Sequence, residues 1–167
     1  MSKKPIVEVK NLKISSNNNY LIRDLSFKVM PNEILGIIGE SGSGKSLTAL
    51  SIIDLIKYKG LKQAGEIVFN PNLIETEKEE NSKAKKSEIA IIFQDPASYL
   101  NPSMKCGAQI MESIVGNEDK LDQALKLLKK VMIDEPEKSL NKYPHELSGG
   151  QQQRVMIAMA LAKKPKI

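Results

Sequence analysis

Tryptophan is absent from this 167-residue chain, and cysteine and histidine occur once each, as Cys106 and His145. A lone cysteine cannot form an internal disulfide, and this composition leaves too few ligands for a metal site of thiolates and imidazoles. The longest uninterrupted apolar run, 155–162, is too short for a bilayer, which requires roughly 20 residues. No apolar stretch follows the basic N-terminus, as a secretion signal would require. We therefore expect a soluble protein of the reducing cytoplasm.

Aromatic residues are also scarce, at 4%, and the excess of positive charge is small: 25 basic residues against 20 acidic ones, a net charge of +5. The lysines lie among glutamates, as at 83–88, and form no basic stripe. Nucleic-acid-binding proteins combine such a stripe with aromatic side chains on which bases stack. The composition therefore predicts a solvated, lysine-rich surface and no nucleic-acid partner.

A glycine-rich loop at 39–46 fits the phosphate-loop pattern G-x-x-x-x-G-K-[ST]. The continuous apolar run 34–38 before it is typical of a parallel strand buried on both faces. Apolar residues recur at helical spacing after it until Gly60. Strand, loop and helix together predict a bound nucleoside triphosphate. The predicted nucleotide-binding residues of the loop are Gly39, Glu40, Ser41, Gly42, Ser43, Gly44, Lys45 and Ser46.

The chemistry of a triphosphate explains these residue types. Glycines adopt backbone conformations that other residues avoid, so main-chain N–H groups can turn toward the phosphates. The start of the following helix adds free N–H groups and a favourable dipole. Lys45 would reach the β- and γ-phosphates, and the Ser46 hydroxyl would be a ligand of Mg²⁺, which prefers oxygen.

The rest of the chain combines short strands with helices. The other predicted strands are 6–9, 21–30, 67–69 and 89–93. Residues 75–88 have the composition of an exposed loop, helical periodicity is clearest over 119–132, and a last helix, apolar nearly all round, begins near Ser148. We divide the chain into a P-loop α/β core with an N-terminal β subdomain at 1–96, a helical subdomain at 97–147, and the last helix with the start of another strand at 148–167.

Two further polar features, Gln94 and residues 147–151, become informative when they are considered together with the phosphate loop. Gln94 follows a predicted buried strand, where it could bind the metal or orient a water. The sequence Leu-Ser-Gly-Gly-Gln at 147–151 opens the last helix, where amides and the Ser148 hydroxyl could meet an anion. Each feature alone is ordinary, because Ser-Gly-Gly is usually just a helix cap and Gln94 could be a surface glutamine.

The three motifs in this order resemble the ATP-binding cassette of ABC transporters, and the resemblance covers about Pro5 to Ile167. Finer features resemble the peptide (oligopeptide/dipeptide) and nickel importer subfamily. These features are Asp95-Pro96, Leu100-Asn101-Pro102, Tyr143-Pro144-His145-Glu146 and residues 152–160.

The resemblance implies an α/β fold, a P-loop NTPase nucleotide-binding domain of the ABC type with a RecA-like core, an antiparallel β subdomain and a helical subdomain. It makes 39–46 the Walker A loop and Gln94 the Q-loop residue that contacts Mg²⁺. The cofactors are then ATP and Mg²⁺, with Ser46 and Gln94 as metal ligands. The signature, which closes over ATP held by an opposite subunit, comprises Leu147, Ser148, Gly149, Gly150 and Gln151.

The resemblance also implies partners and a location. In the family two ABC ATPase subunits, identical or different, sandwich two ATP molecules. Closure upon ATP drives transmembrane permease subunits, which receive cargo from an extracytoplasmic substrate-binding protein. We therefore expect a peripheral subunit at the cytoplasmic face of the cell membrane, coupling ATP binding and hydrolysis to transport of peptides or nickel.

The chain departs from the family pattern in two ways. Cassettes place a base-stacking aromatic where this chain has about Ser16, and the nearest aromatic is Tyr20. The family's Walker B strand, its acidic residues and its switch histidine follow the signature, whereas residues 163–167 resemble only the lead-in to that strand. We therefore expect no catalytic residue within the chain, no hydrolysis by it alone, a fold without its C-terminal part, and a strand at 34–38 and a last helix that are partly uncovered.

Residues 131–136 match the apolar-Asp-Glu-Pro pattern of a Walker B strand, but they lie before the signature, at the end of a predicted helix. We interpret Asp134 and Glu135 as exposed helix-end or loop residues, and His145 as a residue that caps or packs the last helix. Two other functions stay open. One is a non-catalytic nucleotide-binding remnant or regulatory module, and the other is a soluble cassette acting on DNA or ribosomes, which the missing basic stripe disfavours.

Overall fold

The computed structural model describes residues 4–17, 19–57, 60–70, 88–116 and 119–167. The chain divides into two compact units, Met1–Lys86 and Ser87–Ile167. The divisions proposed from the sequence, after residues 96 and 147, stay predictions. The polar loop predicted at 75–88 lies outside the described residues except for Glu88.

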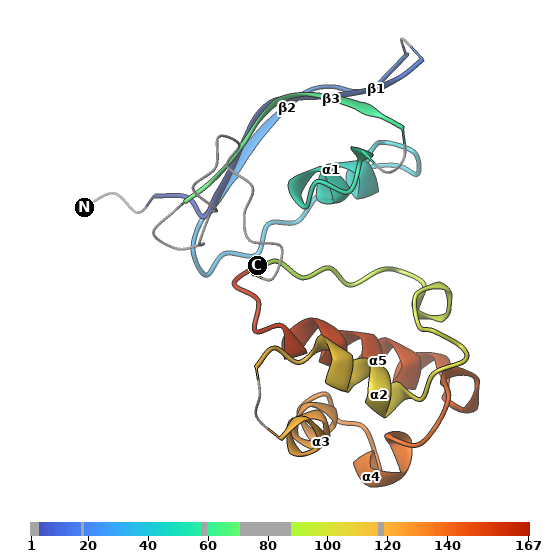
Figure 1. Ribbon diagram of the computed structural model, residues 1–167. Coiled ribbons are helices and arrows are strands. Elements are labelled where there is room, and N and C mark those ends of the chain that lie inside the picture. The colour runs from blue at the N-terminus through green and yellow to red at the C-terminus, as the bar shows by residue number, and fades with distance from the viewer. Residues whose placement is uncertain (1–3, 18, 58–59, 71–87, 117–118) are drawn as a thin grey trace. The chain divides into compact units, whose positions relative to one another are not determined.

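The first unit is built on an antiparallel three-stranded sheet with the order β2-β1-β3 (Figure 1). Its strands are β1 (Val7–Ser16), β2 (Asn19–Val29) and β3 (Lys62–Phe69). The strands predicted near 6–9, 21–30 and 67–69 are therefore confirmed, although β1 begins after Ile6 and β2 ends before Met30. Strands β1 and β3 extend well beyond the ranges predicted from the apolar pattern. A tight hairpin joins β1 to β2, because Ser16 pairs with Asn19.

A β-bulge at Asn11 decides which face of β1 is buried. Val7 and Val9 are buried, and so are Leu12 and Ile14, although strict alternation would place the second pair on the opposite face. Asn11 adopts a left-handed φ of 48° and adds one residue to β1 opposite β3, which restores the face. On β3, Gly65 faces this bulge with a φ of 96°, and a Cβ there would lie 2.4 Å from the Asn11 carbonyl oxygen.

Helix α1 (Lys45–Ile52) runs along one face of the sheet (Figure 1). It buries Thr48 and Ser51, and Ile56 after the helix is fully buried. The prediction of a helix as far as Gly60 is wrong, because α1 ends at Ile52, Ile53 is its C-cap, and Asp54 takes a left-handed φ of 57°.

The strand predicted at 34–38 is not present. The segment has no regular secondary structure, and Ile34 and Ile38 are each 98% exposed. A strand buried on both faces needs hydrogen-bonded neighbours at its edges, and within the described part of the first unit the only sheet is the antiparallel one. The apolar run thus has the composition of a core strand without the neighbours that would make it one.

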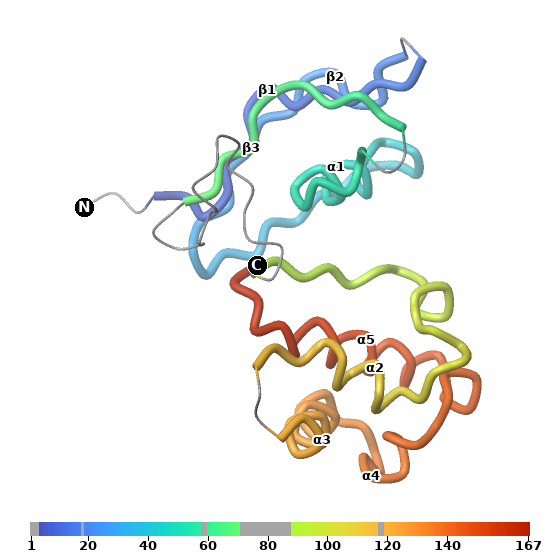
Figure 2. Tube along the Cα trace, in the orientation of Figure 1, coloured from blue at the N-terminus to red at the C-terminus, as the bar shows by residue number. Residues whose placement is uncertain are grey.

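The second unit is helical. Its helices are α2 (Cys106–Ser113), α3 (Lys120–Lys130), α4 (Pro136–Ser139) and α5 (Gly149–Ala162), with short 3-10 helices η2 (Pro96–Ser98) and η3 (Pro144–Glu146). Helices α2 and α3 contact each other and α5, and Figure 2 shows α2 running beside α5. The predicted helices at 119–132 and after Ser148 are confirmed.

The core of this unit lies between α2, α3 and α5. Cys106, Ile110, Leu128 and Val155 have no exposed surface. Helix α5 is only partly covered, as expected, because Ile157, Met159 and Leu161 are half-buried while Val155 and Ala158 are buried.

The strand predicted at 89–93 is also absent as a regular element, but it contains the start of a pairing. Ile167 N–H donates to the Glu88 carbonyl (3.2 Å), and Ala90 N–H donates to the Ile167 carbonyl (2.9 Å). This alternation of bonds on the two sides of one residue is the pattern of a parallel pair. Residues 88–90 and 166–167 therefore make a single parallel pairing, and not a full pair of strands.

Candidate functional site

The loop at 39–46 is shaped by its glycines. Gly42 and Gly44 have φ values of 82° and 94°, which side-chain-bearing residues rarely adopt. The chain turns where Ser43 N–H donates to the Glu40 carbonyl (3.2 Å). A Cβ at Gly39 would lie 2.7 Å from Ser43 Oγ, so this position also favours glycine.

The inner edge of the loop presents main-chain donors. Within the described residues, no acceptor contacts the N–H groups of Gly42, Gly44, Lys45 or Ser46. Gly44 is the N-cap of α1 and has no side chain to cap it, and Ser46 in the first turn is exposed. Free N–H groups at a helix start, together with the helix dipole, form a site suited to an anion.

Lys45 supplies the positive charge of the loop. Its ammonium donates to the carbonyl oxygens of Gly39 (2.8 Å) and Glu40 (2.6 Å) and lies 3.4 Å from Ser43 Oγ. The side chain thus folds back over the loop that precedes it. A flexible ammonium held by neutral carbonyls can exchange them for phosphate oxygens, which are stronger acceptors.

The sheet supports the loop from below. A Cβ at Gly44 would lie 3.0 Å from Cγ1 of Ile22, a buried residue of β2, and 3.6 Å from the Leu21 carbonyl oxygen. Thr48 then donates from both its N–H (2.8 Å) and its hydroxyl (3.0 Å) to the Gly44 carbonyl. The last turn of the loop is therefore fixed between a strand and a helix.

The start of α5 is a second helix N-terminus with main-chain N–H groups that are free within the described residues, which we call the α5 helix mouth. Ser148 is its N-cap: Ser148 Oγ accepts from Gln151 N–H (3.3 Å), and Gln151 Oε1 accepts from Ser148 N–H (3.0 Å). This reciprocal pair is a capping box. The sequence predicts that the Ser148 hydroxyl could meet an anion. The structure shows that the same oxygen caps its own helix.

Gly149 and Gly150 lie open at this helix mouth. Both are exposed, a Cβ at either would meet no atom within 4 Å, and none of the described residues accepts from their N–H groups. Leu147 before them is buried, and Gln152 Nε2 donates to the carbonyls of Pro144 (2.8 Å) and Leu147 (3.2 Å). The glycines are thus exposed on a well-anchored turn.

Gln94 is exposed in the bend that follows the extended segment 89–93. Phe93 before it stacks on Tyr99, with ring centroids 3.7 Å apart and planes within 2°. Asp95 after it caps η2, because Asp95 Oδ1 accepts from Ala97 N–H (3.1 Å). Tyr99 is not among the site residues predicted from the sequence, where the only local signal for it is an aromatic side chain six residues after Phe93, across a proline turn.

The structure groups the predicted site residues in two sets. The loop 39–46 belongs to the first unit, and Gln94 and 147–151 belong to the second. Within the second unit, η2, which follows Gln94, contacts α5, which begins at the signature turn. The assignment of these residues to nucleotide and Mg²⁺ stays a prediction.

The prediction that Asp134 and Glu135, in the segment resembling a Walker B strand, are exposed helix-end or loop residues is confirmed. Asp134 and Glu135 lie after the end of α3, exposed to solvent, and Glu135 has a left-handed φ of 49°. His145 does not cap α5, because Ser148 does; it stacks on Tyr143 with ring centroids 5.7 Å apart.

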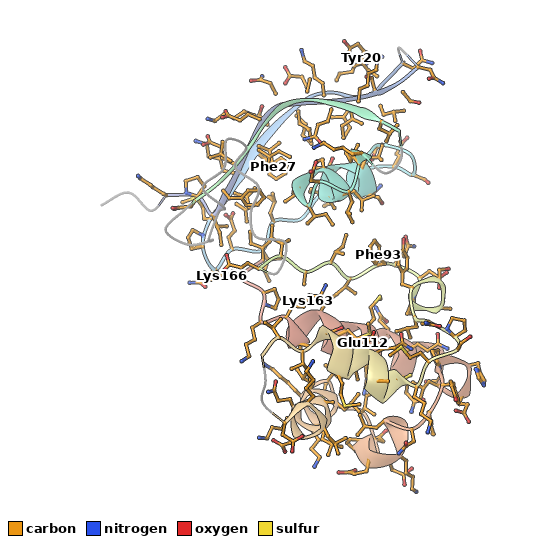
Figure 3. The ribbon with its side chains drawn as sticks, viewed as in Figure 1. Tyr20, Phe27, Phe93, Glu112, Lys163 and Lys166 are labelled. Atoms are coloured by element: carbon orange, nitrogen blue, oxygen red, sulfur yellow. The ribbon has the colours of Figure 1, made fainter. Side chains whose placement is uncertain are left out.

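Tyr20 lies at the hairpin end of the sheet, as Figure 3 shows, and is 61% exposed. It pairs across the hairpin with Ser15, the neighbour of Ser16, where the family places its aromatic. In the described parts of the chain, no group of three or more His, Cys, Asp or Glu side chains could hold a metal ion. No described helix is both long enough and apolar enough to cross a membrane.

A family model described as ABC transporter matches residues 22–167. The chain is 44% identical over 149 residues to the dipeptide transport ATP-binding protein DppD of Haemophilus influenzae, covering 86% of this chain and 45% of that protein. It is 43% identical over 173 residues to the oligopeptide transport ATP-binding protein OppD of Bacillus subtilis, covering 97% and 48%.

Solved structures agree on the fold. A bacterial ABC transporter cassette with a dimeric structure matches with a TM-score of 0.70 and 27% identity, covering 95% of this chain and 70% of that one. The α/β fold of an ABC nucleotide-binding domain is therefore confirmed. The chain spans about half the length of the curated relatives it matches. With the family model matching 22–167, the chain belongs to the ABC transporter family.

Proposed function

We propose that this chain binds ATP with Mg²⁺ as the nucleotide-binding part of an ABC importer for peptides. The observation that carries the proposal is the loop at 39–46. It combines four main-chain N–H groups that no described residue uses with one lysine and the start of a helix. Such an arrangement suits the charge and the oxygen spacing of a polyphosphate.

In this proposal Lys45 moves from the carbonyls of Gly39 and Glu40 to the β- and γ-phosphates of ATP. The N–H groups of Gly42, Gly44 and Ser46 donate to phosphate oxygens, while the positive φ values of the glycines keep these donors turned inward. Because the loop is already supported by Ile22 and Thr48, it needs little reorganisation to bind.

The residues present also fit Mg²⁺. The ion prefers oxygen ligands, keeps several waters and is held by few protein groups when it accompanies a phosphate. Ser46 offers a hydroxyl at the loop and Gln94 an exposed amide oxygen, and neither site requires a cluster of carboxylates. Bound there, the ion would neutralise phosphate charge.

The open helix mouth at Gly149 and Gly150 would meet ATP bound to a second ABC ATPase subunit, identical or different. The unshared N–H groups and the free space around both glycines support contact with an anion from outside the chain. Two such chains would then hold ATP between the loop of one and the signature turn of the other.

The transported cargo and the partners follow from the relatives. Their names refer to dipeptide and oligopeptide transport, which supports peptides rather than nickel as the cargo. The partners would be permease subunits in the membrane, served by an extracytoplasmic substrate-binding protein. The chain would lie at the cytoplasmic face of the membrane as a peripheral subunit, and transport would depend on ATP hydrolysis.

A non-catalytic nucleotide-binding module is the second candidate. Asp134 and Glu135 are exposed, irregular and precede the signature turn, so they are not the carboxylates that ATP hydrolysis would use. Phosphate release should be measured for this chain and for a chain extended by the residues that its relatives carry after the signature. Turnover by the extended chain supports a transport ATPase, and turnover by neither supports the non-catalytic module.

Isothermal titration of ATP in the presence of Mg²⁺ tests nucleotide binding. Lys45→Ala should weaken binding about 10- to 100-fold, since hydrogen bonds to charged groups contribute about 1.5–3 kcal/mol. The matched control is Lys57→Ala, which removes an exposed lysine of the same unit that pairs with Asp54 at 3.1 Å. Equal affinity of Lys45→Ala and the wild type, or no binding by the wild type, would contradict the proposal.

A further inference from the structure

The seven-residue segment from Phe93 to Tyr99 is closed by a contact between the side chains at its two ends. The ring of Phe93 lies on the ring of Tyr99, with centroids 3.7 Å apart. Tyr99 is 54% exposed, so this stack lies at the surface of the second unit and adds little to its core. Gln94 sits directly after the first ring of the pair, and its exposed side chain has no partner in the described part of the chain.

The far end of the segment is anchored to α2. Gln109, only 4% exposed, accepts from Asn101 N–H (2.9 Å) and donates to the carbonyls of Asn101 (3.0 Å) and Met104 (2.8 Å). Leu100, between Tyr99 and Asn101, is buried. The backbone just after Tyr99 is therefore fixed, and Tyr99 presents its ring from a fixed position.

The turn itself is also ordered. Asp95 accepts from Ala97 N–H (3.1 Å) and from the Ser98 hydroxyl (2.5 Å), and Tyr99 N–H donates to the Pro96 carbonyl (3.1 Å). Pro96 opens the 3-10 helix η2 with a restricted φ. Gln94 thus has an ordered turn on one side and, on the other, the ring of Phe93 held by Tyr99.

We propose that Tyr99 is a positioning residue for Gln94, which it orients by stacking on Phe93. This inference rests on the proposed function, in which Gln94 is a ligand of the Mg²⁺ that accompanies ATP. A carboxamide whose backbone is already oriented loses less freedom when it binds the ion. Groups that orient a metal ligand commonly change metal affinity by about 10- to 100-fold when they are removed.

The prediction concerns Mg²⁺ and not ATP alone. The quantity to measure is the ratio of the ATP dissociation constant in EDTA to that in Mg²⁺. Gln94→Ala should lower this ratio, and Tyr99→Ala should lower it by about 10-fold, because the carboxamide is then less ordered. Tyr99→Phe keeps the ring and should keep the ratio, which a role of the phenol hydroxyl would not explain.

The experiment uses the 167-residue chain, titrated calorimetrically with ATP in EDTA and in Mg²⁺. Tyr99→Leu retains apolar bulk without a ring, and Phe93→Leu removes the other ring; both should behave as Tyr99→Ala does. The matched control is Tyr143→Ala, which removes the second stacked tyrosine of the same unit, on His145, and should leave the ratio unchanged. Far-ultraviolet circular dichroism establishes that each variant is folded.

A double variant separates positioning from general damage. If Tyr99 acts only through Gln94, then Tyr99→Ala should have no further effect on the ratio in a Gln94→Ala background. An unchanged ratio in folded Tyr99→Ala or Tyr99→Leu would overturn the inference, as would an unchanged ratio in Gln94→Ala. Failure of the proposed function would look different: the wild type would bind no ATP, or Lys45→Ala would bind ATP as tightly as the wild type does in EDTA and in Mg²⁺ alike.

Discussion

Replacing Gly107 by alanine should destabilise the helical unit, although it places a better helix former in α2. A Cβ at this position would lie 2.7 Å from the Leu140 carbonyl oxygen, 2.8 Å from Leu140 Cδ2 and 3.0 Å from Leu140 Cβ. The carbonyl cannot simply move away, because it accepts from Gly107 N–H at 3.0 Å. The substitution must therefore strain the contact or break the hydrogen bond.

The two opposing effects can be compared. Alanine gains at most about 1 kcal/mol over glycine in a helix, and less in a first turn, where Gly107 lies. Overpacking a close contact costs about 1–3 kcal/mol. The net expectation is a loss of about 1–2 kcal/mol in the free energy of unfolding, which lowers the urea midpoint by about 0.5–1 M at an m-value of about 2 kcal/mol/M.

A matched control exists in the same unit. Gly150 occupies the second position of α5 as Gly107 occupies that of α2, and a Cβ there would meet nothing within 4 Å. Gly150→Ala should therefore leave stability unchanged or raise it slightly. Urea unfolding followed at 222 nm compares the two, and a midpoint for Gly107→Ala equal to that of Gly150→Ala would refute the reasoning.

Two further predictions concern the same unit. Ser148→Ala should lower the free energy of unfolding by about 1 kcal/mol through loss of the N-cap, whereas Ser148→Asp should retain most of it; urea titration decides, and equal losses would contradict the capping role. Burial, with a smaller contribution from Glu146, raises the pKa of the Cys106 thiol from 9.0 to about 11. The folded state thus retains the thiol proton longer than the unfolded state, so stability should fall as pH rises from about 9 to 11. Cys106→Ala should not show the fall in the free energy of unfolding that this thiol causes. If the variant and the wild type lose stability identically between about pH 9 and 11, the thiol does not contribute to the fall.

Local features could be predicted from the sequence because their causes are local. The glycines of 39–46 indicated a loop with unusual backbone angles, and Gly42 and Gly44 have them. The Ser-Gly-Gly sequence at 148–150 indicated a helix start, and the structure has Ser148 as the N-cap of α5, in a capping box with Gln151. The helical spacing of apolar residues over 119–132 likewise indicated a helix, and α3 spans Lys120–Lys130.

The two buried strands predicted at 34–38 and 89–93 do not form, because a strand depends on its neighbours and the apolar pattern does not specify them. The runs 34–38 and 89–93 have nearly the same composition, yet the first is exposed and irregular while the second makes one parallel pairing with 166–167. Backbone hydrogen bonds in a sheet come from another part of the chain, so apolar composition alone does not supply them.

The sequence by itself determined the family motifs, the glycine loop and the helices α3 and α5, because hydrogen bonds within a helix or turn join residues close along the chain. Only the tertiary structure decided that Asn11 bulges to bury Leu12, that Leu140 closes the space beside Gly107, and that Tyr99 stacks on Phe93. Each of these depends on the distance between groups that the chain brings together by folding, and residue spacing along the sequence does not specify that distance.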